Sequence, residues 1–316
     1  MIQISQDLVE CAGLWKRLPG GERGLFDLWE VRACFQHGYG NTPYFVSARD
    51  RRGELVGLLP LSLLAEGGVG FFPGETWNGE TWLENNRFIA ADPRILTEML
   101  QAVPEPLRLR YIAAEGWGGW EEDEFRYLFF PADYGFSYEA YRQALPPKRL
   151  KRLQRELDEM VAGRTLEVRR EQTADIGEFI RLNLAAFGDE SYFADSRFLN
   201  GFELLLEWLR VRGKLRVTTV LIGGEVAAVD VGAVHNNVCT LLAGGTDPRF
   251  PGVAKLINFN HIENACFQGW DCLDFLCGDF GWKERFNLTP RPLYRIDRLP
   301  PAVPHPGIAA AILSDA

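Results

Sequence analysis

Residues 239–286 decide the fold, and they read CTLLAGGTDPRFPGVAKLINFNHIENACFQGWDCLDFLCGDFGWKERF. An apolar run at residues 239–243 ends in two glycines, which predicts a strand followed by a bend. A loop then leads through Gly252 into an apolar-striped segment of about four turns, which predicts a helix. A second apolar run at residues 272–277 predicts another strand. This part of the chain is therefore expected to run strand, glycine-rich loop, helix, strand.

The start of the predicted helix suits a phosphate group. A helix start leaves backbone N–H groups unpaired, and the helix dipole adds partial positive charge there. Small residues keep side chains away, so a phosphate can approach the backbone. We therefore predict that the pyrophosphate of a cosubstrate binds through Gly245, Arg249, Gly252, Val253, Ala254 and Lys255.

Residues 214–243 are expected to form a three-stranded antiparallel meander. Its two connections, Gly223-Gly224 and residues 235–237, are short and rich in glycine and asparagine, which accept the positive φ angles of tight hairpins. The strands are expected at residues 215–222, 226–234 and 238–243. Residues 292–299 are expected to supply a last strand.

Two motifs resemble a known family. The pattern Arg-x-x-Gly-x-Ala at residues 249–254 resembles the acyl-CoA pyrophosphate loop of the GNAT acyltransferases. Asp274-Phe275-Leu276-x-Gly278, followed by Trp282-Lys283-x-Arg285-Phe286, is similar to the FemAB and CelD-like branch of that superfamily. That branch has an aspartate-bearing strand, a glycine and then an aromatic–lysine pair. The resemblance implies acyl-CoA as the cosubstrate.

The branch is built from two GNAT-like units in tandem, so the resemblance covers most of the chain. It implies the α/β (α+β) class, with mixed, mostly antiparallel sheets flanked by helices. A break at residues 131–135 places an N-terminal GNAT-like domain at residues 1–133. Residues 134–316 would form a C-terminal GNAT-like domain that carries the donor site.

The N-terminal third is expected to be rich in strands. These are expected at residues 43–48, 55–64, 107–113 and 125–130. Residues 115–124 are expected to form a loop. Asp92 is expected to cap a helix that begins with Pro93.

Composition narrows the class of protein. The 316 residues are 47% apolar, enough for two ordinary domains with real cores. The net charge of −9 argues against nucleic-acid binding through the overall field. None of the six cysteines has C-x-x-C spacing, so we expect reduced thiols and no metal site. With no signal peptide and no membrane-spanning run, a cytoplasmic location is expected.

Three residues are candidates for catalysis. Asp230 has small neighbours on its face of the strand, which leaves room for a ligand and favours a raised proton affinity, as a base needs. The alternative is a buried aspartate satisfied by a neighbouring loop. Many GNAT enzymes place a tyrosine near Trp282, and the resemblance puts Lys283 there instead, where it would stabilise negative charge and be oriented by Asp279. The alternative for Lys283 is a surface lysine paired with Asp279 or Glu284.

Two loops carry side chains suited to an acceptor. The loop at residues 71–87 contains Trp77 and Asn78, and flat apolar surfaces beside amide groups suit a sugar or an amine. Packing of a long loop across a domain interface would explain these residues equally. Tyr192 lies in the loop at residues 188–196, which in GNAT proteins helps to cover the acceptor; local packing is the alternative there.

A helix starting at Pro147 carries five cations in its first half, among them Arg149 and Arg152. Positive charge is unfavourable near a helix start. The cluster indicates either a solvated face or a site for an anionic group of the acceptor or cosubstrate.

We therefore predict an N-acyltransferase that moves an acyl group from acyl-CoA to an amine, on a small molecule, a glycan or a lipid. The first alternative is a FemABX-like aminoacyltransferase that uses charged tRNA, which the acidic net charge and the loop at residues 249–254 disfavour. The second alternative is a non-catalytic ligand-binding protein that kept the fold, because the usual tyrosine is missing.

Overall fold

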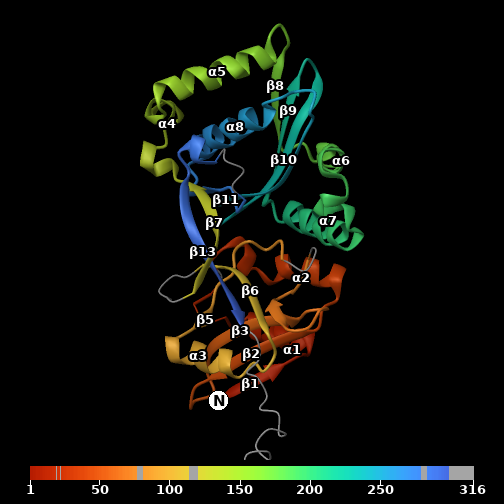
Figure 1. Cartoon of the computed structure of the whole chain (residues 1–316), viewed down its shortest axis with the longest axis vertical. Coiled ribbons are helices and arrows are strands. Elements are labelled where there is room, and N and C mark those ends of the chain that lie inside the picture. Colours follow the sequence, from red (N-terminus) through yellow and green to blue (C-terminus); the bar gives the residue numbers. More distant parts are fainter. Residues whose placement is uncertain (19, 22, 77–80, 114–119, 279–282, 299–316) are drawn as a thin grey trace, which may run out of the picture.

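The structure is a computed structural model that describes the chain except for residues 19, 22, 77–80, 114–119, 279–282 and 299–316 (Figure 1). The α-helices are α1 (Leu8–Trp15), α2 (Trp29–Tyr39), α3 (Pro93–Gln101), α4 (Tyr138–Ala144), α5 (Pro147–Val161), α6 (Ile176–Phe187), α7 (Ser196–Val211) and α8 (Val253–Gln268). The strands are β1 (Ile2–Ser5), β2 (Pro43–Arg49), β3 (Leu55–Leu63), β4 (Val69–Phe71), β5 (Ile89–Ala90), β6 (Leu107–Ile112), β7 (Glu121–Phe129), β8 (Leu166–Arg170), β9 (Leu215–Ile222), β10 (Glu225–His235), β11 (Val238–Thr246), β12 (Cys272–Asp274) and β13 (Thr289–Arg298).

The strands join into one open sheet in the order β1-β2-β3-β4-β6-β13-β7-β12-β11-β10-β9-β8, and β5 pairs with β3. Named strands pair in parallel only between β4 and β6 and between β11 and β12, so the sheet is mixed and mostly antiparallel. Helices flank it in both halves of the molecule (Figure 1). The predicted α/β class is confirmed.

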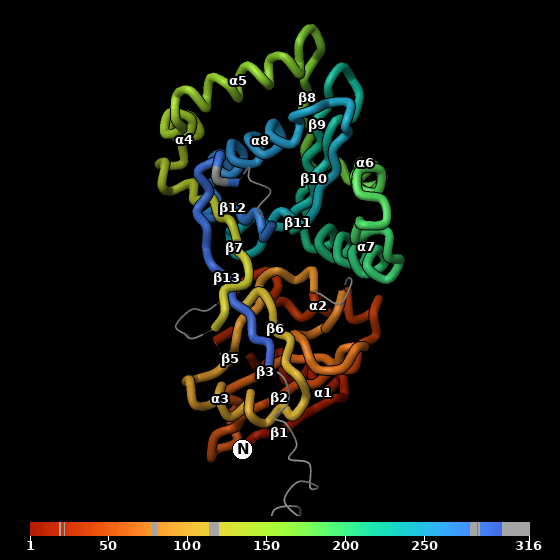
Figure 2. Tube along the Cα trace, viewed as in Figure 1, coloured from red at the N-terminus to blue at the C-terminus, as the bar shows by residue number. Residues whose placement is uncertain are grey.

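Two strands connect the halves of the sheet. β7 pairs with β12, which follows it by more than 140 residues, and β13 inserts between β6 and β7. Figure 2 shows β7 and β13 running between the lower, N-terminal lobe and the upper lobe. The two sheets expected for two separate units are therefore joined into one continuous sheet. The domain boundary at residue 133 stays a prediction.

A buried ion pair fastens β7 to β12. The Nε and Nη2 atoms of Arg126 donate to Oδ2 of Asp274 at 2.9 and 2.5 Å. Asp274 is fully buried, and its Oδ1 accepts the backbone N–H of Leu276 at 3.0 Å. A buried charge is tolerated when it is paired and hydrogen-bonded, and this carboxylate has both kinds of partner.

The halves also touch through α2 and α7. A Cβ atom at Gly38 would lie 2.4 Å from the carbonyl oxygen of Arg197, and one at Gly201 would lie 3.1 Å from the ring of Phe35. Glycine is required at Gly38, because a side chain there would strike backbone that cannot move aside. A core cluster of aromatic residues from both halves fills this contact, including Phe35, Trp82, Phe198 and Phe202.

Most of the predicted elements are confirmed. The meander forms β9, β10 and β11, the helix after Gly252 is α8, and Asp92 accepts the N–H groups of Arg94 and Ile95 at the start of α3. The loop expected at residues 115–124 is wrong in part, because Glu121–Glu124 already belong to β7. Helix α2 was missed, since its buried face includes Arg32 and Gln36, which interrupt the apolar stripe that periodicity detects.

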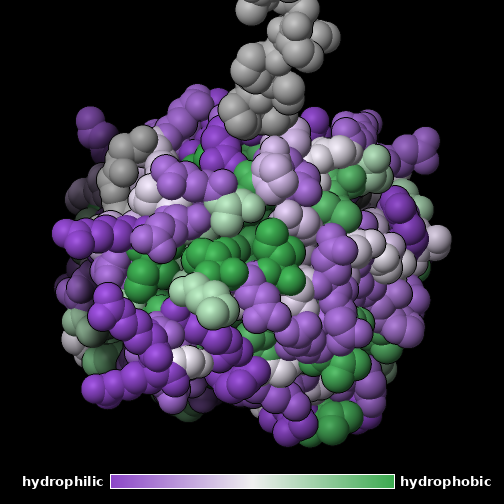
Figure 3. All heavy atoms as spheres, turned by 90° about the horizontal axis from the view of Figure 1, so that it is seen from below, coloured by the Kyte–Doolittle hydropathy of each residue, from purple (hydrophilic) through white to green (hydrophobic). Residues whose placement is uncertain are grey.

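Two observations on the described residues concern membrane-spanning helices and metal sites. They contain no helix that is both long and apolar enough to cross a bilayer, and no group of three or more His, Cys, Asp or Glu residues placed to hold a metal ion. All six cysteines are free. Viewed from the end of the N-terminal lobe, apolar side chains gather near the middle of the face within a hydrophilic rim (Figure 3).

Replacing Arg126 with methionine should lower the free energy of unfolding by about 3–5 kcal/mol, because Asp274 would remain buried without its countercharge. The matched control is Arg295→Met, whose partner Glu121 is mostly exposed on the same sheet, and which should cost less than about 1 kcal/mol. Chemical denaturation measures both. Equal, small losses would show that the buried pair does not hold the sheet together.

Candidate active site

The site begins where β11 and β12 part. The two strands pair in parallel only from Val238 to Thr240 and from Cys272 to Asp274. β12 ends at Asp274, whereas β11 continues to Thr246, so beyond Thr240 none of the described strands pairs with this edge of β11. Unpaired backbone N–H and C=O groups at such an edge can bind a ligand.

A cavity of about 490 Å³ occupies this opening. A volume of this size accommodates a small organic molecule. Its walls come from β10, β11, α6, α8, the loop before α7, the segment after β12, and a loop of the N-terminal half. The lining includes Trp82, Glu84, Asn183, Tyr192, Asp230, Leu242, Gly244, Asn258, Phe275, Cys277 and Lys283.

Asp230 lies on β10 directly opposite Gly244 of β11. A Cβ atom at Gly244 would stand 2.0 Å from Oδ1 of Asp230, so only glycine lets the carboxylate lie across β11 toward the cavity. Oδ2 lies 2.9 Å from Nε2 of His261, which is buried on α8. The partner of Asp230 is therefore a histidine on a helix, and the alternative of a neighbouring loop is wrong.

Lys283 lines the cavity and fixes the segment of residues 275–277, which we call the cavity floor. Its side chain is buried, and Nζ donates to the carbonyl oxygens of Phe275, Leu276 and Cys277 at 2.9, 2.9 and 2.6 Å. Leu276 has φ of +53°, a conformation costly for a leucine, and these bonds stabilise it. The alternative of a surface lysine is wrong, because the ammonium is enclosed by backbone carbonyls.

Glu84 enters the cavity from the N-terminal half. Its Oε2 accepts the backbone N–H of Cys277 at 2.6 Å, between residues 193 positions apart in the sequence. Burial raises the pKa of this carboxyl to about 7, and the Cys277 hydrogen bond and Lys283 limit the rise. A carboxyl with a pKa near 7 can exchange protons at neutral pH. Glu84 belongs to the loop at residues 71–87, whose mixture of aromatic and polar side chains was expected to suit an acceptor, but no local signal marked this residue as a base.

A small hydrogen-bond network fixes the loop that covers the cavity. Asn183 of α6 donates through Nδ2 to the carbonyl oxygen of Gly244 at 2.8 Å, and its Oδ1 accepts the hydroxyl of Ser191 at 2.7 Å. Ser191 in turn accepts the N–H of Phe193. Tyr192 lies between them and lines the cavity, where the sequence analysis expected it. Its role as an acceptor contact stays a prediction.

The predicted phosphate loop is open at its backbone. Gly252 has φ of +95°, a Cβ atom there would meet none of the described atoms within 4 Å, and the first turn of α8 has no acidic residue. Gly245 has another role: a Cβ atom there would lie 2.6 Å from the carbonyl oxygen of Phe179, so it permits close packing of α6 on β11. Val253 and Ala254 form the first turn of α8.

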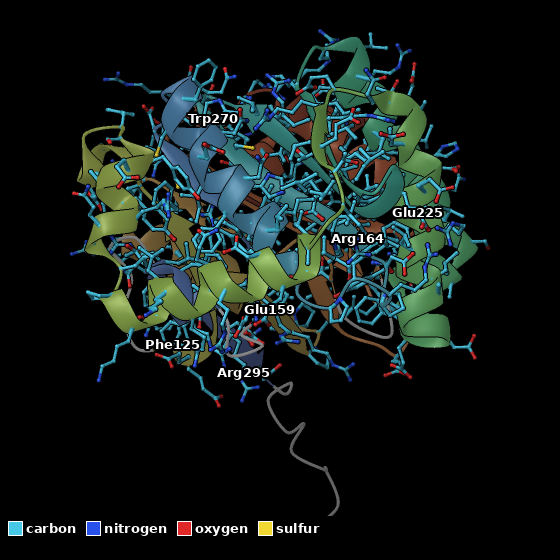
Figure 4. The ribbon with its side chains drawn as sticks, turned by 90° about the horizontal axis from the view of Figure 1, so that it is seen from above. Phe125, Glu159, Arg164, Glu225, Trp270 and Arg295 are labelled. Carbon is cyan, nitrogen blue, oxygen red and sulfur yellow. The ribbon has the colours of Figure 1, made fainter. Side chains whose placement is uncertain are left out.

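The cations of that loop already have carboxylate partners. Arg249 binds Asp247 and Glu225, each at 2.7 Å, and Lys255 binds Glu156 of α5. Figure 4 shows Glu225 on the far side of the upper lobe from α4. Two N–H groups at the start of α8 also have acceptors, because Val253 donates to the carbonyl oxygen of Phe250 at 3.1 Å and Lys255 to that of Gly252 at 2.9 Å. A phosphate there would be attracted mainly by the helix dipole and would approach the uncovered backbone at Gly252.

Two predicted cations, Arg149 and Arg152, do not line the cavity. Arg149 and Arg152 lie on α5, where Arg149 donates to the carbonyl oxygen of Arg285 at 3.3 Å and Arg152 lies 3.7 Å from Glu156. Figure 4 shows α5 as the outer helix of the upper lobe. Trp77, Asn78 and Asp279 lie outside the described residues, so their roles stay predictions.

The comparisons agree with this geometry. Residues 147–284, less than half of the chain, match the family model described as an acetyltransferase (GNAT) domain. No curated protein matches the chain.

Solved structures resemble the whole chain. FemX has a TM-score of 0.55 at 10% identity, covering 92% of this chain and 95% of its own. L-PGS from Bacillus licheniformis has a TM-score of 0.52 at 10% identity, covering 95% and 94%. A tandem GNAT protein from the clavulanic acid biosynthesis pathway has a TM-score of 0.50 at 11% identity, covering 93% and 97%. The chain therefore shares the fold of these proteins, which include a tandem GNAT protein.

Replacing Lys283 with methionine should lower the free energy of unfolding by at least about 2 kcal/mol, because three buried carbonyl groups lose their donor. Lys16→Met, at an exposed position after α1, is the matched control and should change stability little. Chemical denaturation and turnover are measured on both variants. Unchanged stability with lost turnover would instead support the direct electrostatic role expected from the sequence.

Proposed function

We propose that the protein transfers an acyl group from acyl-CoA to an amine, with Glu84 as the general base. The observation that carries this proposal is the carboxyl of Glu84, with a pKa of about 7, in a cavity at the strand divergence of a GNAT domain. A base with a pKa near the working pH combines the ionised form with a useful proton affinity.

The charges of the cavity favour a cationic acceptor. Three carboxylates line it, those of Glu84, Glu190 and Asp230. The ammonium of Lys283 faces them, but it donates to three backbone carbonyls. An alkylammonium ion is attracted into such a site. Aromatic side chains around the carboxylates would contact the organic part of the acceptor.

The reaction follows from these groups. The carboxylate of Glu84 takes one proton from the ammonium, and the neutral nitrogen attacks the thioester carbon. A C–N bond forms as the carbonyl oxygen gains negative charge, which N–H groups on the open edge of β11 would stabilise. The C–S bond then breaks, the thiolate leaves, and the second proton of the nitrogen passes to the sulfur. The products are an amide, CoA thiol and protonated Glu84.

The donor would bind with its pyrophosphate at the start of α8. Asn258, which lines the cavity, lies six positions after Gly252, which corresponds to about 9 Å along a helix. The thioester arm must therefore extend at least that far to place its carbonyl beside Glu84. The part of the β11 edge that pairs with no described strand would offer backbone groups to the amides of that arm, apart from the Gly244 carbonyl that Asn183 occupies.

An amine of a small molecule, a glycan or a lipid fits this proposal, and six free cysteines agree with a reducing, cytoplasmic location. The fold is shared with FemX, but the net charge of −9 does not favour tRNA as the donor.

Glu84→Gln should lower kcat/KM by about 10²-fold or more, because an amide cannot accept the proton. In the unmutated protein kcat/KM should rise with pH through about 7, as the carboxylate forms, and the variant should lack this limb. Glu98→Gln, at an exposed position on α3, is the control. Thiol release from acetyl-CoA with a diamine, an amino sugar and an amino acid provides the assay. Equal rates for both variants would remove Glu84 from the mechanism.

Gly252→Asp should weaken CoA binding about tenfold more than Gly252→Asn, measured by calorimetry. Both side chains strain the same positive-φ backbone, and only aspartate places negative charge where the pyrophosphate approaches the helix start. Equal affinities for the two folded variants would place the donor elsewhere.

A further inference from the structure

A second cavity, of about 720 Å³, lies where the two halves of the molecule meet. Its walls come from the loop before α2, the segment Asn85–Ala91, β7, and the first residues of β11 and β12. It shares no lining residue with the active-site cavity, and its volume lies in the range of small-molecule sites.

The charge of this second cavity is opposite to that of the protein. Three arginines line it, Arg23, Arg87 and Arg126, against a single carboxylate, that of Asp27. His235 also lines it, and burial together with Lys214 lowers the pKa of its imidazole, which favours the neutral form. Three arginines against Asp27 and against Asp274, the partner of Arg126, leave an excess of one positive charge here, in a chain whose net charge is −9.

Hydrogen bonds fix two of these arginines through Nε and Nη2, and the Nη1 group of each is left for a ligand. Arg87 binds Asp27 through Nε and the carbonyl oxygen of Gly21 through Nη2, and Arg126 binds Asp274 through Nε and Nη2. Their side chains are only 15% and 21% exposed. Among the described residues, neither Nη1 has a hydrogen-bond partner. A fixed guanidinium with free N–H donors is suited to bind a carboxylate or phosphate.

The rest of the lining is neutral. Asn85 adds an amide and Thr240 a hydroxyl, while Leu25, Phe88 and Phe130 add apolar surface. An anionic group with an apolar body complements both parts of this wall.

We propose that this cavity binds a small organic anion, whose carboxylate or phosphate is held by Arg87 and Arg126. The site is separate from the proposed acyl transfer and does not depend on it. Asn85 directly follows Glu84 in the chain, so an occupant would lie beside the segment that carries the base.

Calorimetry on the full chain tests the proposal with benzoate, phenyl phosphate and the uncharged benzyl alcohol, at constant ionic strength. We expect one saturable site for at least one anion and none for benzyl alcohol. Comparison of benzoate with phenyl phosphate identifies the preferred group. Asn85→Asp, which is nearly isosteric and keeps both arginine pairs, should weaken binding about tenfold by adding a like charge.

Asn200→Asp adds the same charge at an exposed position on α7 and should leave the affinity unchanged. Any of three results would overturn the proposal: no saturable binding of either anion, equal affinity in the two variants, or competition of the probes with CoA. These readouts need no turnover, so they remain informative if the acyltransferase assay fails.

Discussion

The buried carboxylate of Asp274 is the point on which both the sheet and the site depend. One of its oxygens binds Arg126 and so joins β12 to β7, and the other accepts the N–H of Leu276. The first contact holds the two halves in one sheet. The second begins the turn that forms the floor of the cavity. Because a buried carboxylate is stable only with its partners in place, the fold and the site are coupled at this residue.

The floor itself is fixed from three sides. Asp274 binds the N–H of Leu276, Lys283 binds three successive carbonyl groups, and Glu84 binds the N–H of Cys277. Two of these side chains lie in the part that matches the GNAT model, and Glu84 comes from the N-terminal half. The residues that match the GNAT model therefore form only part of the wall of this cavity. An isolated fragment of residues 147–284 would have neither the proposed base nor the strands β7 and β13 beside β12.

The sequence predicted those elements whose formation depends mainly on residues close together in the chain. The meander and α8 follow from alternating apolar residues, glycine-rich turns and a helical stripe, and all of them form. Asp230 and Lys283 were placed near the site because they lie on or beside those elements. The ion pair of Arg126 and the position of Glu84 could not be predicted, since each joins residues far apart in the chain. The burial of Lys283 was also hidden, because composition around a lysine does not reveal which carbonyl groups will enclose it.

The path of β13 has a consequence for how the molecule folds. This strand is the last one described, yet it lies in the interior of the sheet, between β6 and β7. Its neighbours are made long before it, and until it arrives β6 and β7 each present an open edge. Open edges can pair with strands of other chains, so the chain is prone to aggregate until β13 is in place. Closing the sheet requires contacts of very high sequence separation, which slows folding. The other strands of the lower lobe are thus synthesised well before β13 can complete their sheet.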